Sequence, residues 1–198
     1  MPTKTGDRNR NRSPEETPPM GTSPIDPCDR TMQSMFLDLR GPSSYVAHGS
    51  LRVEPSIDRD FNAVETYLRG DSIMRRTFDH LEHARQPTYV VEDASTPRCA
   101  DAYQSNERRI WWNPTVAHHF ADGGRQSPAL ALAHEAAHAD ESDDARARLA
   151  SHNVPKYDNA EERRVIAGPE SHAARSLGES VRHSHRATAY HVDNPTHR

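Results

Sequence analysis

The chain has 198 residues, a length that suits one compact domain with additional tails. Only 33% of the residues are hydrophobic and 6% are aromatic, 15 are prolines, and the mean hydropathy is -0.96, so the composition is too polar for a chain packed along its whole length. The formal net charge of -4 excludes the broad basic field with which many proteins bind nucleic acids.

Residues 1–55 are predicted to be a disordered leader. They are rich in Pro, Ser, Thr, Arg and Gly, and they offer almost no apolar surface to offset the entropy lost on folding. Two interpretations of the leader stay open: a flexible segment without a specific role, or a secretion or targeting signal. The apolar stretch MFLDL at 35–39 is either a short helical turn or a docking site for a secretion chaperone.

Two helices are predicted at the start of the folded domain, which we expect to span residues 56–192. The first helix begins at the capping candidate Asp58 and stops at Gly70, and the second is capped by Asp71 and ends before Pro87. Apolar residues at helical spacing give each helix one buried face. These residues are Phe61, Val64, Tyr67 and Leu68 in the first helix and Ile73, Met74, Phe78 and Leu81 in the second.

Two short strands and an alanine-rich helix follow. TYVVED at 88–93 and RRIWWNP at 108–114 contain β-branched and aromatic residues and are bounded by Pro and polar clusters, which predicts a small sheet. The segment ALALAHEAAHADE comes next, with Ser127 as the capping candidate and Pro128 at the first helical position. Its alanines strongly favour a helix.

The last third of the chain is predicted to be helical and polar. Asn159 caps one helix and Gly168 terminates it, and a further helical segment begins after Pro169 and is interrupted or ends around Gly178. Residues 193–198 are expected to form a polar tail. Together these elements predict an α+β fold that is mainly helical, with a small sheet, and we expect a monomer.

The cysteines and the hydropathy of the chain bear on its compartment. Cys28 and Cys99 lie far apart, and Cys28 falls in the predicted leader, so neither a disulfide framework nor a thiolate metal site is indicated. No apolar run approaches the roughly 20 residues that a membrane-spanning helix needs. The N-terminus lacks the apolar core of a Sec signal peptide. We therefore expect a soluble protein without a Sec-type export signal.

The strongest functional signal is His134-Glu135-Ala-Ala-His138, an H-E-x-x-H motif. On a helix, histidines four residues apart project from the same face, so both can bind one zinc ion (Zn2+) at about 2.0–2.1 Å. Glu135 lies beside that face, where its carboxylate can accept a proton from water held by the metal. The alternative is a surface helix of a chain that contains 13 histidines. The capped helix and its apolar residues favour the metal site.

A hydrolytic zinc site usually has three protein ligands and one open position, so a third ligand is needed. Glu161 and Glu162 are candidates because they follow His138 by 161 − 138 = 23 and 162 − 138 = 24 residues, enough for a second helix to return to the first. The alternative for this pair is a solvated acidic surface. Another histidine could replace the carboxylate, and most of these are expected to be solvated: His118, His119, His183, His185 and His191.

The motifs resemble two groups of zinc metalloproteases. HEAAHA at 134–139 and EERRVI at 161–166 are similar to the H-E-x-x-H-A and E-E-x-R patterns of clostridial neurotoxin light chains. WWNP at 111–114, the helix entry at Ser127 and ESVR at 179–182 with the later Tyr190 resemble the NleD-like and HopH-like type III secreted effectors more closely. This resemblance covers roughly residues 105–192.

The resemblance implies a gluzincin fold and zinc-dependent cleavage of a host protein after injection into the host cytosol by a type III secretion system. Some members of these families cleave mitogen-activated protein kinases. By the same resemblance, Glu162 is the third zinc ligand, and Arg182 or Tyr190 stabilises the oxyanion of the tetrahedral intermediate. The sequence departs from the commonest pattern at Ala136, Ala137 and Ser180, none of which removes a metal-binding atom.

The mechanism predicted from these residues is hydrolysis in which Glu135 takes a proton from water and returns it to the leaving amine. RRIWWNP beside the motif helix could bind the substrate as an added strand. Two rival functions stay open. One is a non-catalytic protein that binds a host partner, with a degenerate motif. The other is a zinc hydrolase that acts on cell-wall or small peptides.

Overall fold

The computed structural model describes residues 44–93 and 101–198. Its first part is a five-stranded mixed sheet in the order β1-β2-β3-β5-β4. The strands are β1 (Val46–His48), β2 (Leu51–Val53), β3 (Thr88–Glu92), β4 (Ala102–Gln104) and β5 (Arg109–Trp112). Strands β2, β3 and β5 are parallel, and the two edge strands run antiparallel to their neighbours. MFLDL at 35–39 and both cysteines lie outside the described residues.

Strands β1 and β2 lie within the segment 1–55 that was predicted to be disordered, so that prediction is wrong for its last part. The strand β2 was missed because its three residues are too few to show clearly the alternation of apolar and polar side chains that marks a strand. Leu51 and Val53 are both 0% exposed, and β2 pairs in parallel with β3. Such a short strand is stable only because β3 and the helices cover it. The folded part of the chain therefore begins earlier than residue 56.

Helices α2 (Asp58–Leu68) and α3 (Ser72–Glu82) confirm the first two predicted helices. Asp71 caps α3 as predicted, because its side chain accepts hydrogen bonds from the backbone N–H groups of Ile73 and Met74 at 2.9 Å each. Asp58 does not cap α2, since its carboxylate instead contacts Nε2 of His48 at 2.7 Å.

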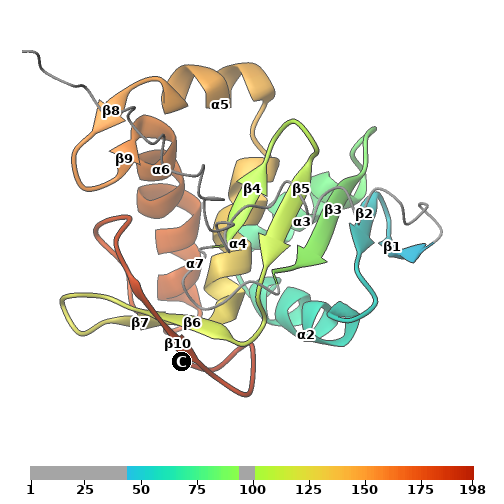
Figure 1. The fold of residues 1–198 in the computed structure, drawn as a ribbon, viewed down its shortest axis with the longest axis horizontal. Helices are drawn as coiled ribbons and strands as arrows, with labels where there is room; N and C mark the ends of the chain where they lie inside the picture. The colour runs from blue at the N-terminus through green and yellow to red at the C-terminus, as the bar shows by residue number, and fades with distance from the viewer. Residues whose placement is uncertain (1–43, 94–100) are drawn as a thin grey trace, which may run out of the picture.

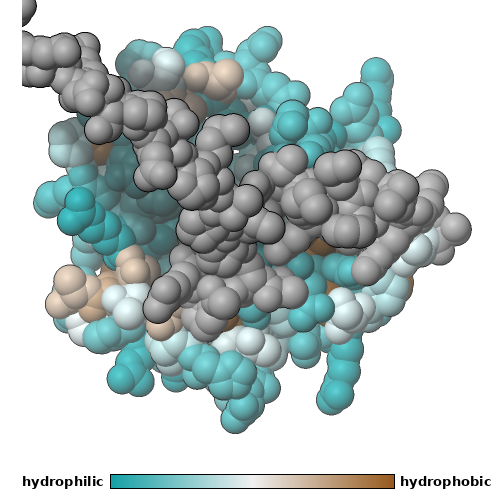
Figure 2. Space-filling view, viewed as in Figure 1, coloured by the Kyte–Doolittle hydropathy of each residue, from teal (hydrophilic) through white to brown (hydrophobic). Residues whose placement is uncertain are grey.

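The apolar faces of α2 and α3 form the core with β2, β3, β5 and helix α4 (Pro128–Ala139). Figure 1 shows the arrangement: the sheet is on the right, helices α6 and α7 are on the left, and α4 lies between them. Every residue of α4 is buried. The visible outer surface is mainly hydrophilic, with small hydrophobic patches (Figure 2).

The N-terminus of α4 is fixed by groups from three distant parts of the chain. Ser127 occupies the capping position but makes no side-chain cap; instead its N–H and its hydroxyl both donate to the carboxylate of Glu179 at 2.7 Å. An acidic group at this end of a helix is favoured by the helix dipole. Trp112 donates from Nε1 to the carbonyl of Pro128 at 2.8 Å, and the carbonyl of Pro195 accepts from the N–H of Ala129 at 2.9 Å. The predicted polar tail thus lies against α4.

The remainder of the chain adds helices and two small sheets. Strands β6 (Val116–His119), β7 (Arg125–Gln126) and β10 (Thr188–His191) form an antiparallel sheet in the order β10-β6-β7. Helix α5 (Asp143–Ala150) leads to a hairpin of β8 (Asn153–Val154) and β9 (Asp158–Asn159). Then come α6 (Ala160–Val165), a π-helical segment η2 (Ile166–Glu170) and α7 (Ser171–Ser176).

Gly168 does not terminate the helix that begins after Asn159, contrary to the prediction. Pro169 lacks an N–H, and its ring would clash with a carbonyl of the preceding turn in an α-helix, but the chain widens there into a π-helical turn. The hydroxyl of Ser171 donates to the carbonyl of Ile166 at 2.6 Å and supports this turn. The helical run therefore continues from α6 through α7 and ends next to Gly178, as predicted for that end.

The observed fold is α+β with mixed sheets, in agreement with the predicted class. The sheet is larger than expected, because β1, β2 and β4 were not predicted as strands. In residues 44–93 and 101–198, no helix is long and apolar enough to cross a membrane.

Candidate metal centre

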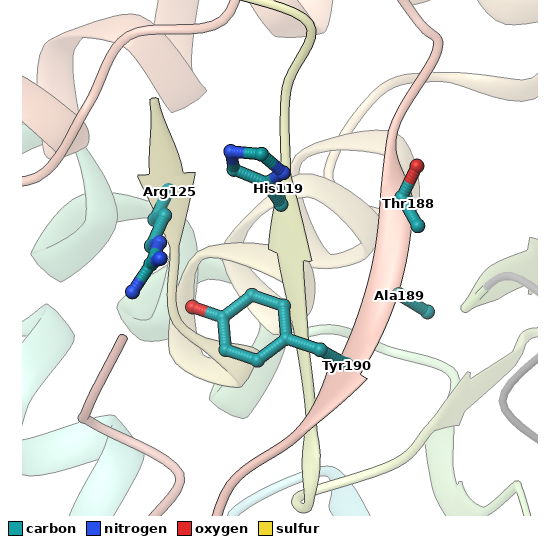
Figure 3. Close-up of a pocket in the computed structure, with 5 residues that line it drawn as sticks. All are labelled: His119, Arg125, Thr188, Ala189 and Tyr190. Carbon is teal, nitrogen blue, oxygen red and sulfur yellow. The ribbon is translucent and has the colours of Figure 1, made fainter. Parts of the chain in front are cut away.

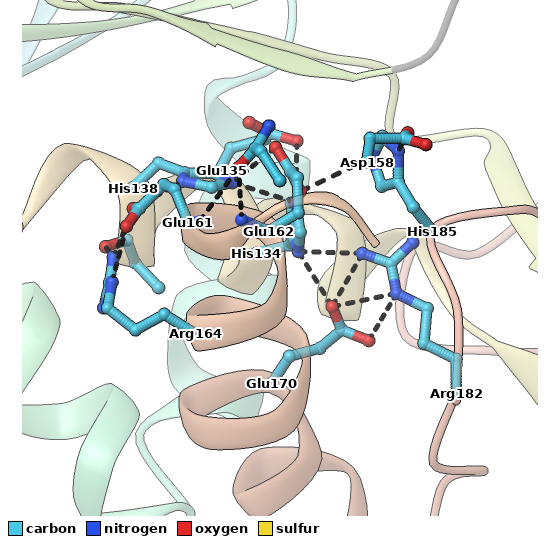
Figure 4. A network of polar contacts seen from close by, with 12 residues as sticks. His134, Glu135, His138, Asp158, Glu161, Glu162, Arg164, Glu170, Arg182 and His185 are labelled. Atoms are coloured by element: carbon cyan, nitrogen blue, oxygen red, sulfur yellow. Dashed lines mark hydrogen bonds and ion pairs between the residues drawn. The ribbon is translucent and has the colours of Figure 1, made fainter. Parts of the chain in front are cut away.

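The two motif histidines lie side by side on the buried helix α4. His134 is 5% and His138 is 6% exposed, and their Nε2 atoms are 3.1 Å apart (Figure 4). The surface helix considered as an alternative for this motif is therefore wrong. The alanines of α4 are small and let the neighbouring segments approach the helix closely, which keeps the imidazoles out of water.

Each histidine is oriented by a carboxylate at its other ring nitrogen. Nδ1 of His134 lies 2.8 Å from Oε2 of Glu170, and Nδ1 of His138 lies 2.9 Å from Oε1 of Glu161. A carboxylate accepts a proton but cannot donate one when ionised, so Nδ1 of His138 carries a hydrogen, whereas Nδ1 of His134 also lies 2.8 Å from Nη2 of Arg182, which is a donor. In a neutral His138 ring this leaves the Nε2 lone pair facing Nε2 of His134, as in metal sites with carboxylate-histidine pairs.

Glu162 faces the two Nε2 atoms, whereas Glu161 does not. Oε2 of Glu162 is 3.1 Å from Nε2 of His134, and Oε1 is 3.4 Å from Nε2 of His138. Ligand atoms of a tetrahedral zinc ion with bonds of about 2.0–2.1 Å lie about 3.3 Å apart. Oε2 of Glu162 is also buried and makes no hydrogen bond of acceptable geometry. The three side chains thus converge at separations close to those of zinc ligands, with each histidine facing a different oxygen of Glu162.

The adjacent carboxylate, Glu161, has a different set of contacts. It is 2% exposed, and besides His138 it accepts hydrogen bonds from Nε and Nη2 of Arg164 at 2.8 and 2.6 Å. Asn159 caps α6 by accepting from the N–H groups of both glutamates, as predicted. This cap sets the rotation of the first helical turn, and that rotation directs one glutamate toward Nδ1 of a histidine and the other toward Nε2.

The electrostatics of the group favour a cation between the imidazoles. Burial lowers the pKa of His138, but Glu161 and Glu162 outweigh it and raise the pKa to about 9. The pKa of His134 is also raised, since Glu135, Glu162 and Glu170 outweigh its burial. Burial raises the pKa of Glu162, but the two histidines outweigh it and hold the pKa far below the usual range. A bound metal ion would satisfy the same negative potential as these protons.

Glu135 lies beside the two histidines. Its Oε1 lies 3.9 Å from Nε2 of His134, and the residue is 6% exposed. His134, Glu135 and His138 form one group that could hold a metal ion, and His134, Glu162 and His185 form an overlapping one, each with candidate atoms within 4.8 Å of one another. The chain therefore contains a buried H-E-x-x-H group of the kind found in metalloenzymes.

The group opens into a cavity of about 270 Å³. The wall opposite α6 includes Asp101, Ala102 and Tyr103 of the β4 region, and His185 lines it as well. Burial raises the pKa of Asp101 to about 8, and the charge of Glu135 adds to this effect. A cavity with convergent polar groups of shifted pKa is a usual form for a binding site.

Glu170 is a site residue that the sequence reasoning missed. It is 1% exposed, contacts His134, and accepts hydrogen bonds from Nε and Nη2 of Arg182 and from Nε2 of Gln126, the last at 2.9 Å. The helix predicted from Asn159 was expected to stop at Gly168, before Glu170. Without that stop, Glu170 follows Glu162 by 170 − 162 = 8 residues, which on an ideal α-helix ends about 80° away from the direction of Glu162, so the spacing gives only a weak signal.

Arg182 and Tyr190, the two oxyanion candidates, lie in different places. Arg182 forms an ion pair with Glu170 at 2.8 Å, and its Nη2 lies 2.8 Å from Nδ1 of His134 (Figure 4). Tyr190 belongs to β10 and lines a separate cavity of about 340 Å³ with His119 and Arg125 (Figure 3). The structure therefore brings Arg182 to the back of the histidine pair and does not bring Tyr190 to the cavity beside it.

The other histidines are mostly solvent-exposed, as expected: His119, His183 and His191 are exposed. His118 is half-buried, and burial lowers its pKa to about 4. His185 differs from them because it lines the cavity beside the motif.

No protein-family model, no curated protein and no solved structure matches the chain.

Proposed function

We propose that this protein is a zinc-dependent endopeptidase. The observation that carries the proposal is the convergence of His134, His138 and Glu162 at spacings of 3.1–3.4 Å, with the carboxylate of Glu135 beside them. Two imidazoles and a carboxylate are the protein ligands of many hydrolytic zinc sites, and such sites keep one position open. Glu162 is thus the proposed third ligand, and Glu161 orients His138.

A zinc ion held by these residues supplies Lewis acidity, which activates water and polarises a carbonyl. Glu135 is the proposed general base: it accepts a proton from the attacking water and passes it to the leaving amine. Its burial beside His134 excludes bulk water, which would otherwise compete for the same proton.

The resemblance assigns stabilisation of the oxyanion to Arg182 or Tyr190, and we retain this assignment as part of the proposal. The contacts of Arg182 support a positioning role besides, because it holds Glu170 and Glu170 holds His134. Tyr190 has a buried hydroxyl with no hydrogen-bond partner. It would have to leave its present cavity to reach a substrate beside His134.

We propose that the substrate binds as an extended strand along β4. The segment RRIWWNP was the expected docking strand, but β5, which it forms, lies inside the described sheet between β3 and β4. Among the described residues, strand β4 pairs on one side only, with β5, and Ala102 and Tyr103 line the cavity. An edge strand offers unpaired backbone groups to a peptide.

The proposed biological setting is a type III secreted effector that cleaves a host protein in the host cytosol, with a mitogen-activated protein kinase as one substrate candidate. The motif resemblance and the Ser- and Pro-rich composition of residues 1–55 support it. The proposed chaperone contact at 35–39 belongs to the same setting.

The test combines metal analysis with proteome-wide mapping of new protein N-termini. We expect one zinc per chain, and we expect wild-type protein, but not the Glu135→Gln variant, to generate new termini in a host-cell lysate. The variant should keep its zinc, because Glu135 is not a proposed ligand. Zinc binding without new termini in folded proteins would favour a binding protein or a hydrolase of cell-wall or small peptides, which peptide and peptidoglycan substrates would then separate.

A further inference from the structure

His185 reaches the metal group from the segment between α7 and β10. Its Nε2 lies 3.5 Å from Oε2 of Glu162, and its ring stacks on His134 with centroids 6.2 Å apart and planes 24° apart. His134, Glu162 and His185 present candidate ligand atoms within 4.8 Å of one another. The side chain of His185 is 37% exposed, so it lies at the mouth of the cavity, above the buried pair.

The contacts of His185 repeat the pattern seen at His134 and His138. Its Nδ1 lies 2.5 Å from Oδ2 of Asp158, while its Nε2 is directed toward Glu162. All three imidazoles therefore have a carboxylate at Nδ1 and the same glutamate near Nε2. A surface histidine with no role in binding has no reason to share this arrangement, which fixes the tautomer that a metal ligand needs.

Two anchors on the β8–β9 hairpin hold His185 in place. Asp158 is one of them, and the other is the carbonyl of Lys156, which accepts a hydrogen bond from the N–H of His185 at 2.7 Å. Both Lys156 and Asp158 have positive φ values, 78° and 68°, which residues other than glycine seldom adopt. Local strain of this kind is often found at functional sites.

Other histidines of the same region lack this arrangement. His183, two residues earlier, is exposed. His191 lies 3.4 Å from Asp193, but both of these side chains are largely exposed, at 67% and 102%, and neither lines the cavity. The position of His185 is therefore not explained simply by the large number of histidines near the C-terminus.

We propose that His185 is a fourth protein ligand of the zinc ion, oriented by Asp158, and that it occupies the open position until substrate displaces it. The proposal rests on the proposed function for the metal itself. Four protein ligands close a zinc site, whereas hydrolysis needs a position for water. The exposure of His185 and its location outside regular secondary structure allow it to leave, which neither His134 nor His138 can do from the buried helix α4.

The test measures coordination directly, without an activity assay. X-ray absorption spectroscopy of zinc-loaded wild-type protein should count three imidazoles, and the His185→Gln variant should show two with an added water oxygen. The optical spectrum of cobalt-loaded protein should change in the same variant. Chelator competition should show zinc affinity falling at least about tenfold, since loss of an orienting partner alone costs 10–100-fold. Asp158→Asn should weaken affinity by a smaller factor.

His183→Gln is the matched control, because it replaces an exposed histidine of the same segment, and we expect its affinity and spectra to equal those of the wild type. Two imidazoles in the wild type, or unchanged affinity and spectra in His185→Gln, would overturn the inference while leaving the endopeptidase proposal intact. Failure of the wild type to bind stoichiometric zinc, or binding that survives His134→Gln, would overturn both.

Discussion

The Glu170→Gln substitution removes the negative charge that His134 and Arg182 share behind the metal group. Glu170 is 1% exposed, and its two oxygens accept hydrogen bonds from Nε and Nη2 of Arg182 at 2.8 Å each. Glutamine conserves the volume but leaves the guanidinium without a counter-charge. The side chain of Arg182 is only 10% exposed, so water compensates little.

The expected loss of stability in Glu170→Gln follows from the burial of the Glu170–Arg182 ion pair. Removing one partner of a buried pair costs about 3–5 kcal/mol. The pKa gives a similar value: burial raises the pKa of Glu170, but the charge of Arg182 and the hydrogen bond with His134 lower it from 4.5 to about 2. A shift of that size corresponds to about 3 kcal/mol of stability, which is present above pH 4.5 and lost as the pH falls toward 2.

The assay is urea unfolding of metal-free protein at pH 7, together with chelator competition for zinc. We expect Glu170→Gln to lower the free energy of unfolding by about 3 kcal/mol and zinc affinity by about 10–100-fold. Adding Arg182→Met to Glu170→Gln should restore part of the stability, because no unpaired charge remains. It should not restore affinity, since Nδ1 of His134 still lacks its carboxylate.

A control substitution is Asp143→Asn, whose side chain is 72% exposed, and we expect its stability to stay within about 0.5 kcal/mol of the wild type. A loss below about 1 kcal/mol for Glu170→Gln would refute the proposed burial cost of the pair. The proposed cost would also be refuted if the double variant lost as much free energy of unfolding as the two single variants lose together.

Three further predictions concern the cavity side of the site. Glu135→Gln should lower kcat by about 10²–10⁴ with zinc affinity unchanged, measured on any substrate identified by the N-terminal mapping; parallel loss of zinc would instead make Glu135 a ligand. Glu162→Gln should weaken zinc binding more than Glu161→Gln does, because only Glu162 faces both Nε2 atoms, and equal losses in chelator competition would contradict this. Asp101 should destabilise the fold as the pH rises from about 4 to 8, since its raised pKa of about 8 makes the native state bind the extra proton over that range. Asp101→Asn should flatten the pH dependence of unfolding there, and an unchanged slope would show that Asp101 is ionised throughout.

Features that depend on neighbours in sequence were predictable. A helical period of 3.6 residues places His134 and His138 on one face whatever the rest of the chain does, and the structure has their Nε2 atoms 3.1 Å apart. Asp71 and Asn159 cap their helices because a cap needs only the next two or three N–H groups. Helices α2 and α3 and strand β3 were predictable for the same reason, since their patterns involve only residues close in sequence.

Features that depend on contacts between distant segments could not be predicted from the sequence. Ser127 looked like a cap, yet Glu179 takes that role from 179 − 127 = 52 residues away. Leu51 and Val53 looked too isolated to form a strand until β3 was paired with them. Gly168 looked like a helix stop, but packing of η2 against α4 stabilises the π-helical turn through which the chain continues.

By itself the sequence determined that two imidazoles and a glutamate share one helix, because helical geometry is set by the backbone of adjacent residues. Only the tertiary structure decided between Glu161 and Glu162 as the residue facing Nε2, added Glu170 and brought His185 beside His134 and Glu162. These side chains meet through helix packing and a returning C-terminal segment, and no spacing in the sequence encodes where such segments come to lie.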